Sequence, residues 1–167
     1  YCYLDFSAYT DIAIGLGALM GYGLPENFDW PILAVNLQDY WRRWHMTLSG
    51  WCQRNIFMPA TLATRDTIVP VLLTMLAVGM WHAFTLSWFL WAIHHTTGLV
   101  VLARFSKGSK RRGARAKKSH GARRVASTLA TVLFAAGGYC FAFVNHPATS
   151  IQLYARYWLA ILSLGFL

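Results

Sequence analysis

The sequence predicts an all-α membrane protein: a polytopic bundle of transmembrane helices with additional re-entrant or interfacial helices. Of its 167 residues, 56% are hydrophobic and only 13% are charged, whereas charged residues make up about 25% of an average soluble domain. No charged residue occurs between Ile68 and Ala103, and other apolar runs flank this one. Uncharged runs of this length are typical of chains that cross a bilayer.

The first segment, residues 1–23, is mostly apolar and predicts a helix with a polar side. Its glycines allow close helix contacts, as small residues do in membrane bundles. Asp5 and Asp11 are expected to face the interior of the bundle or water, because lipid would penalise a carboxylate. The segment between Pro25 and Pro31 then ends the helix, since proline cannot continue it.

Residues 32–60 predict an amphipathic helix that does not cross the membrane. Large apolar residues and one histidine recur at helical spacing: Trp41, Trp44, His45, Leu48 and Trp51. The side chains of Arg42, Arg43 and Arg54 oppose burial in hydrocarbon. The segment is therefore expected to lie at the interface or to enter the bilayer as a re-entrant helix.

The uncharged run from Ile68 to Ala103 is too long for one helix. A single helix of that length would extend about 54 Å at 1.5 Å per residue, against a hydrocarbon core of about 30 Å. A break near Gly79 gives two helices, over roughly 68–81 and 84–103. The break places His82 at a helix junction, where irregular backbone is tolerated only if it lines protein or a water-filled cavity.

Residues 104–124 are predicted to form a basic cytoplasmic loop, between apolar helices expected over 84–103 and 125–145. Ten lysines and arginines occur here without an acidic residue, which by the positive-inside rule indicates the cytoplasmic side and allows contact with anionic lipid headgroups. Residues 26–66 are then cytoplasmic too, with His45 starting on that side and His82 at the far end of its helix. Residues 151–167 begin a further helix.

The net charge of +9 does not indicate nucleic-acid binding, because the basic segment lacks the interleaved aromatic residues of single-strand binders. A metal centre is not predicted either, since His45 and His82 have no carboxylate nearby in sequence. The three cysteines have no ligand spacing. No tightly bound cofactor is expected.

Two histidines are candidate catalytic residues. His82 follows Gly79, Met80 and Trp81 in apolar sequence, and His45 lies on the aromatic face of its helix. A neutral imidazole can serve as a general base or an acyl acceptor near pH 7, and surrounding tryptophans would limit hydrolysis. His94 and His95 are adjacent in one helix, so both cannot face one pocket.

Four motifs, in order, resemble the membrane-bound O-acyltransferase family in its bacterial branch typified by alginate O-acetyltransferase. They are Tyr3-Leu4-Asp5-Phe6-Ser7-Ala8-Tyr9-Thr10-Asp11, Leu24-Pro25-Glu26-Asn27-Phe28, Asp39-Tyr40-Trp41-Arg42-Arg43-Trp44-His45 and Gly79-Met80-Trp81-His82. The resemblance implies that residues 1–167 form the C-terminal part of one membrane domain of this family.

The resemblance also implies a site and a reaction. His82 matches the presumed catalytic histidine and His45 the second one, and Trp41, Arg42, Arg43, Trp44 and Trp81 are expected to bind substrate. The reaction implied is passage of an acetyl or other short acyl group from a cytoplasmic acyl-CoA or acyl-carrier thioester to an exopolysaccharide such as alginate. Implied partners are membrane lipids and an extracytoplasmic acetyltransferase or polysaccharide machinery, at a bacterial inner membrane that the chain crosses several times.

A second interpretation of the same residues is a non-catalytic transport or export component whose histidines relay protons. Dependence on a thioester donor separates an acyltransferase from such a component. The residues alone leave both interpretations open.

Overall fold

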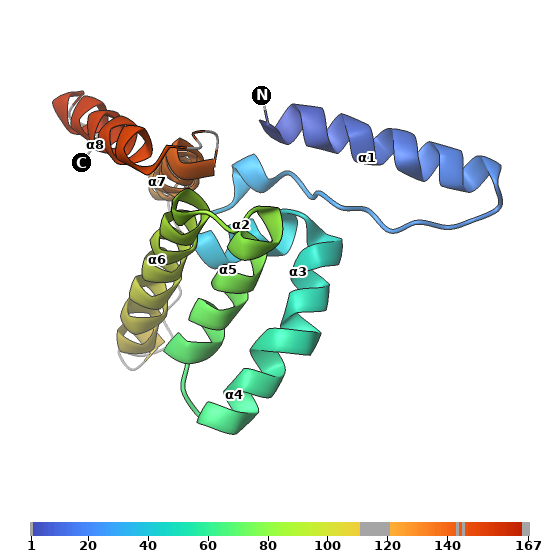
Figure 1. Cartoon of the computed structure of the whole chain (residues 1–167), viewed down its shortest axis with the longest axis horizontal. Coiled ribbons are helices and arrows are strands. Elements are labelled where there is room, and N and C mark those ends of the chain that lie inside the picture. The colour runs from blue at the N-terminus through green and yellow to red at the C-terminus, as the bar shows by residue number, and fades with distance from the viewer. Residues whose placement is uncertain (1, 111–120, 143, 145, 165–167) are drawn as a thin grey trace.

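The computed structural model describes residues 2–110, 121–142, 144 and 146–164, and in this part of the chain all regular structure is helical. This confirms the predicted all-α class. Figure 1 shows the order of the elements. They are α1 (Cys2–Leu19), the short 3₁₀ turn η1 (Pro31–Leu33), α2 (Leu37–Arg43), α3 (Met46–Cys52), the π-helical turn η2 (Gln53–Phe57), α4 (Met58–Thr64), α5 (Ile68–His82), α6 (Leu86–Lys110), α7 (Gly121–Ala142) and α8 (Pro147–Ser163).

Helix α1 ends before Pro25, earlier than predicted. Gly21 has a φ of +83°, and the N–H groups of Gly21 and Tyr22 donate to the carbonyls of Ala18 and Gly17 at 3.0 and 2.8 Å. This is the pattern of a glycine-terminated helix end. The helix projects from the rest of the chain (Figure 1) and buries none of its residues. Asp5 and Asp11 are exposed, so the described residues do not place them in a bundle interior.

The prediction of a single amphipathic helix over residues 32–60 is wrong, because the chain leaves the helical conformation at His45. His45 has a φ of 45° and a ψ of 58°, in the left-handed region, which a side chain other than glycine adopts only at a cost. Helix α2 ends at Arg43, and α3, η2 and α4 then run on as one helical arm to Thr64. This arm packs along α5 (Figure 1).

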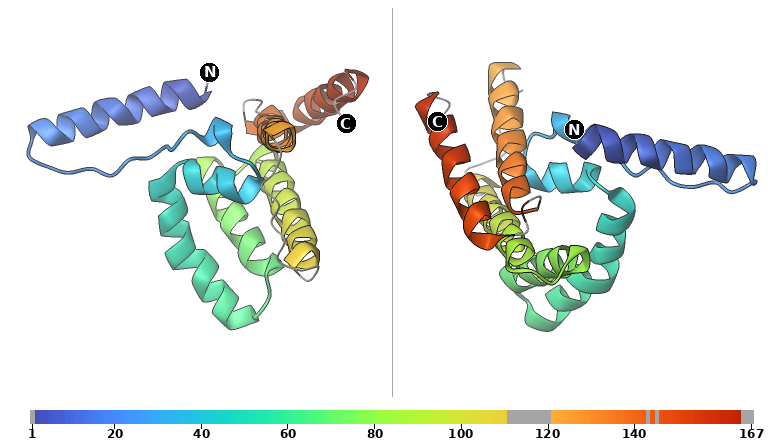
Figure 2. Two further views of the ribbon diagram at one scale, coloured as in Figure 1. Left: turned by 180° about the vertical axis from the view of Figure 1, so that it is seen from behind. Right: turned by 45° about the horizontal axis from the view of Figure 1, so that its top comes forward.

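The predicted break after residue 81 is confirmed. Helices α5 and α6 form a tight hairpin (Figure 2), joined through Ala83, whose backbone is extended. The hairpin is close because Gly79 has no side chain: a Cβ there would lie 2.8 Å from the carbonyl oxygen of Trp88. At the open end of the hairpin, the N–H groups of Thr67 and Ile68, and more weakly the charge of Arg104, lower the pKa of Asp66.

The bounds predicted for the basic loop are wrong at both ends. Helix α6 continues to Lys110 and α7 already begins at Gly121, so helical structure takes up part of 104–124. The rest of that segment, residues 111–120, lies outside the described residues. Helices α7 and α8 begin about four residues earlier than predicted, α8 because Pro147 suits a first helical turn.

Among the residues that the structure describes, two helices are long and apolar enough to cross a membrane, Leu86–Phe105 in α6 and Gly121–Ala142 in α7, and α5 is a shorter apolar helix. A core of Met75, Val78, Trp91 and Ala92 packs where α5 meets α6. A second cluster packs α2 against α7 around Leu37, Tyr40 and Ala135. These two clusters fix α2, α5, α6 and α7 around the cavity described next.

Candidate active site

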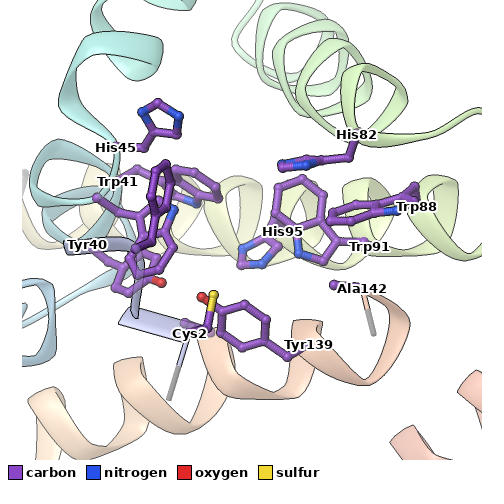
Figure 3. A pocket seen from close by; sticks show the side chains of 13 residues that line it. Cys2, Tyr40, Trp41, His45, His82, Trp88, Trp91, His95, Tyr139 and Ala142 are labelled. Carbon is purple, nitrogen blue, oxygen red and sulfur yellow. The ribbon is translucent and has the colours of Figure 1, made fainter. Parts of the chain in front are cut away.

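A cavity of about 230 Å³ lies where α1, α2, α5, α6 and α7 converge, and both predicted catalytic histidines border it (Figure 3). Most of its other wall residues are aromatic. The aromatic residues are Phe6, Tyr40, Trp41, Trp44, Trp88, Trp91 and Tyr139, and the remaining wall residues are Cys2, His95, Ala135 and Ala142. None of the described residues that line this wall is an aspartate or a glutamate. Its basic groups are the imidazoles of its histidines.

His45 occupies the left-handed junction between α2 and α3. Its Nδ1 lies 3.1 Å from Oδ1 of Asn27, and its ring contacts the ring of Phe6 on α1 edge-on, with 5.0 Å between centroids. Burial lowers the pKa of His45 below its ordinary value, because desolvation disfavours the imidazolium. His45 is therefore a neutral base at pH 7.

His82 is the last residue of α5, and its ring stacks on the indole of Trp88 from α6, with centroids 4.2 Å apart and an interplanar angle of 10°. Trp81 lies between the two histidines, 4.7 Å from the ring of His82 and 6.4 Å from that of His45. The expectation that they occupy opposite ends of α5 is therefore wrong. The helical arm starts at His45 and descends, and α5 returns alongside it to His82, so both imidazoles reach the same end.

The structure brings some of the predicted substrate-binding residues to the cavity. Trp41 and Trp44 line it, and the ring of Trp44 stacks on Tyr40 at 5.7 Å. Trp81 does not line the cavity, and 63% of its surface is exposed.

The two predicted arginines point elsewhere. Arg43 forms ion pairs with Asp39 at 3.0 Å and Asp29 at 3.2 Å, which hold the loop before α2 against that helix. Arg42 borders a second cavity of about 610 Å³ between the helical arm, α5 and the apolar residues 99–103 of α6. Trp41 borders both cavities, so its indole stands between them.

Sequence reasoning missed several residues of the site, and His95 had the clearest signal. The adjacent histidines divide as expected: His95 borders the cavity, while His94 bonds to α7 and α8. The Nε2 atom of His94 lies 2.9 Å from the carbonyl oxygen of Phe134, and its Nδ1 lies 2.9 Å from the hydroxyl of Tyr154. Trp88 and Trp91 on α6 and Tyr139 on α7 had no comparable signal. Asn27 stands in one of the four motifs, but nothing in the sequence assigned it a role.

Two buried polar atoms beside the cavity have no hydrogen-bond partner among the described residues: Nδ1 of His95 and Nε1 of Trp41. Their rings lie 5.2 Å apart. Native proteins rarely leave such atoms unpaired, so a bound molecule with a polar oxygen would suit this wall. No group of three or more His, Cys, Asp or Glu is placed to hold a metal ion in the described part of the chain.

Comparison with known proteins gives consistent relatives. The profile of the membrane-bound O-acyltransferase family matches residues 1–111. The chain is 36% identical over 102 residues to a protein named probable alginate O-acetylase AlgI from Pseudomonas putida, covering 59% of this chain and 21% of that protein. It is 36% identical over 112 residues to the peptidoglycan O-acetyltransferase of Helicobacter pylori, covering 65% of this chain and 21% of that protein.

The teichoic acid D-alanyltransferase of Bacillus subtilis is 29% identical over 121 residues, covering 66% of this chain and 31% of that protein. The chain thus spans about a fifth to a third of the length of these relatives. The family profile, which matches residues 1–111, includes both cavity histidines.

Proposed function

We propose that this chain, which belongs to the membrane-bound O-acyltransferase family, carries the reaction centre of an O-acyltransferase. The observation that supports this most directly is the convergence of His45 and His82 on one cavity walled by aromatic side chains. Such walls exclude water and so protect an activated acyl group from hydrolysis. The two histidines come from the two motifs that resemble those of the family.

The acyl donor in this proposal is a cytoplasmic thioester, either acyl-CoA or an acyl carrier. The larger cavity supports this, because the cation of Arg42 lies in its wall. An anionic phosphate-bearing donor would be attracted to that side. Its thioester would reach the smaller cavity past the indole of Trp41, which borders both.

His82 acts at the reaction centre as general base or transient acyl acceptor, and His45 assists it. The transfer forms a bond between the acceptor hydroxyl oxygen and the acyl carbon, breaks the bond between that carbon and sulfur, and passes the hydroxyl proton to the leaving thiolate through an imidazole. Stacking on Trp88 fixes the plane of the His82 ring. No tightly bound cofactor is needed for this step.

The acyl group is acetyl or another short chain, and the final acceptor is an exopolysaccharide such as alginate. A cavity of about 230 Å³ is somewhat larger than an apolar cavity of about 150 Å³ that binds benzene, which suits a short acyl group. The names of the relatives cited above support a cell-envelope polymer as acceptor. The setting is a bacterial inner membrane crossed several times, and an extracytoplasmic acetyltransferase or polysaccharide machinery is the proposed partner.

The test is His82→Ala in the complete protein, with acylation of the cell's polysaccharide as the readout. Loss of a general base or nucleophile costs about 10²- to 10⁴-fold in rate, so acylation is expected to fall to background while membrane insertion is retained. His146→Ala is the matched control, because His146 is exposed at the start of α8 and is expected to keep parental activity.

Near-parental acylation by His82→Ala would contradict the proposed role. Donor dependence separates the alternative, a proton-relaying transport component. An acyltransferase consumes a thioester in proportion to product, whereas a transport component responds to the pH gradient and consumes none.

A further inference from the structure

We infer that Asn27 is a positioning residue that fixes the tautomer of His45, so that Nδ1 donates to Asn27 and Nε2 is the proton acceptor for acyl transfer. This inference rests on the proposed function for its kinetic consequence. The side chain of Asn27 lies in the irregular segment between α1 and η1 and is buried, with 7% of its surface exposed.

The orientation of the Asn27 amide follows from Thr47. The backbone N–H of Thr47 lies 3.2 Å from Oδ1 of Asn27, and the Thr47 hydroxyl lies 3.0 Å from the same atom. A backbone N–H can only donate, so the amide atom that faces it must be the oxygen. The opposite orientation would place two donors against each other in a buried site.

The tautomer of His45 follows from that orientation. Nδ1 of His45 lies 3.1 Å from the same Oδ1, and an amide oxygen can only accept. The Thr47 hydroxyl also lies 3.4 Å from Nδ1, but it donates its single proton to Oδ1 at the shorter distance of 3.0 Å. Nδ1 therefore carries the hydrogen. In a neutral imidazole the other nitrogen then holds the lone pair, so Nε2 is the basic atom. When Nε2 takes up a proton, the bond from Nδ1 to Asn27 persists unchanged.

Asn27 also holds the backbone that aims this ring. Its own carbonyl oxygen accepts from the N–H of Met46 at 2.9 Å, directly after the left-handed residue His45. The side chain of His45, the N-cap residue of α3, makes no capping hydrogen bond. Oδ1 of Asn27 takes its place by accepting from the N–H of Thr47 in the first turn of α3, 20 residues further along the chain. One residue therefore determines both the backbone conformation and the protonated nitrogen of His45.

The chemical consequence is a defined base. His82 is then the transient acyl acceptor of the proposed function, and Nε2 of His45 assists by accepting the proton of the acceptor hydroxyl as its oxygen bonds to the acyl carbon. The bond between that carbon and His82 breaks, and the proton passes to the released imidazole of His82. The titratable groups that border the same cavity are Cys2 on α1, Tyr40 on α2, His82 on α5, His95 on α6 and Tyr139 on α7. Of the carboxylates close to Asn27 and His45 in sequence, that of Glu26 is exposed, and those of Asp29 and Asp39 are paired with Arg43.

The test is Asn27→Asp in the complete protein. A carboxylate of the same shape accepts the same three hydrogen bonds but adds a negative charge next to Nδ1, which favours the imidazolium. The acid limb of the pH–rate profile is expected to move to higher pH by about 1 to 3 units. Asn36→Asp is the matched control: it makes the same charge change at the N-cap of α2, where aspartate caps equally well, and its profile is expected to be unchanged.

An Asn27→Asp profile with an unshifted acid limb would overturn the inference. If that variant is inactive at every pH, ¹⁵N spectra of the parental protein decide, with His45 assigned by comparison with His45→Gln. Protonated Nδ1 and unprotonated Nε2 support the inference, and the reverse pattern overturns it. Failure of the proposed function looks different, because the parental protein itself would then transfer no acyl group while the tautomer stays measurable.

Discussion

At the residue scale, His45 combines two features that cost free energy and are compensated locally. Its left-handed backbone is held by Asn27 and Met46, and its ring is buried among aromatic side chains of the cavity wall. Strained residues of this kind persist only where the surroundings determine them, and they cluster at functional sites. The same burial keeps the imidazole neutral.

This burial predicts a pH dependence of stability. Because the folded pKa of His45 is below its ordinary value, the unfolded chain takes up the proton first as the pH falls. The native state therefore loses stability as the pH drops through about 6.5, the ordinary value for histidine. The measurement compares thermal unfolding midpoints in detergent at pH 8 and pH 5 for the parental protein and His45→Gln. A parental midpoint that falls no further than that of His45→Gln would refute the prediction.

Sequence patterns singled out the two histidines that border the cavity but not the residues that support them. His45 and His82 were predictable because an imidazole in apolar, tryptophan-rich sequence is unusual. Asn27 was not, because its bonds to His45 and Thr47 join positions 18 and 20 residues apart, across a segment without periodicity. The role of Arg43 was also hidden, since its partners Asp29 and Asp39 become neighbours only after the chain folds.

At the element scale, helix boundaries depended on single residues. The break near His82 was predicted because the uncharged run from Ile68 to Ala103 is too long for one helix, and in the structure α5 ends at His82. The break at His45 could not be predicted, because residues 32–60 have an unbroken helical period and the interruption comes from a tertiary bond to Asn27. Conversely, basic residues after Arg104 suggested a loop, yet they are compatible with helix, and α6 continues through them to Lys110.

The α5–α6 hairpin gives a prediction at this scale. Gly79→Ala places a Cβ 2.8 Å from the carbonyl oxygen of Trp88, and backbone cannot move aside as a flexible side chain can. The two helices must separate, with an expected loss of about 1 to 3 kcal/mol. Gly15→Ala is the control: no atom lies within 4 Å of its added Cβ, and alanine favours a helix interior by about 0.5 to 1 kcal/mol. Equal unfolding midpoints for the two variants would contradict this packing.

At the scale of the whole molecule, the cavity and the basic residues Arg65 and Arg104 lie at opposite ends of the α5–α6 hairpin. His82 is at the closed end, while Arg65 and Arg104 lie near the open end, where the charge of Arg104 acts on Asp66. Helix α6 has 25 residues and is therefore about 37 Å long, enough to cross a hydrocarbon core of about 30 Å. If the basic end is cytoplasmic, the cavity lies toward the other face, where a polysaccharide hydroxyl would be available.

Cysteine labelling at the two ends of this hairpin tests that orientation. In a background without Cys2, Cys52 and Cys140, Ser109→Cys is expected to resist a membrane-impermeant thiol reagent in intact cells, because the adjacent lysines and arginines retain that end in the cytoplasm. Phe84→Cys, at a position with 89% of its surface exposed in the turn after His82, is expected to react from outside. Both cysteines should react once the cells are permeabilised. If Ser109→Cys but not Phe84→Cys is labelled in intact cells, the orientation is reversed and the cavity lies on the cytoplasmic side. Donor and acceptor could then no longer approach the cavity from opposite faces of the membrane.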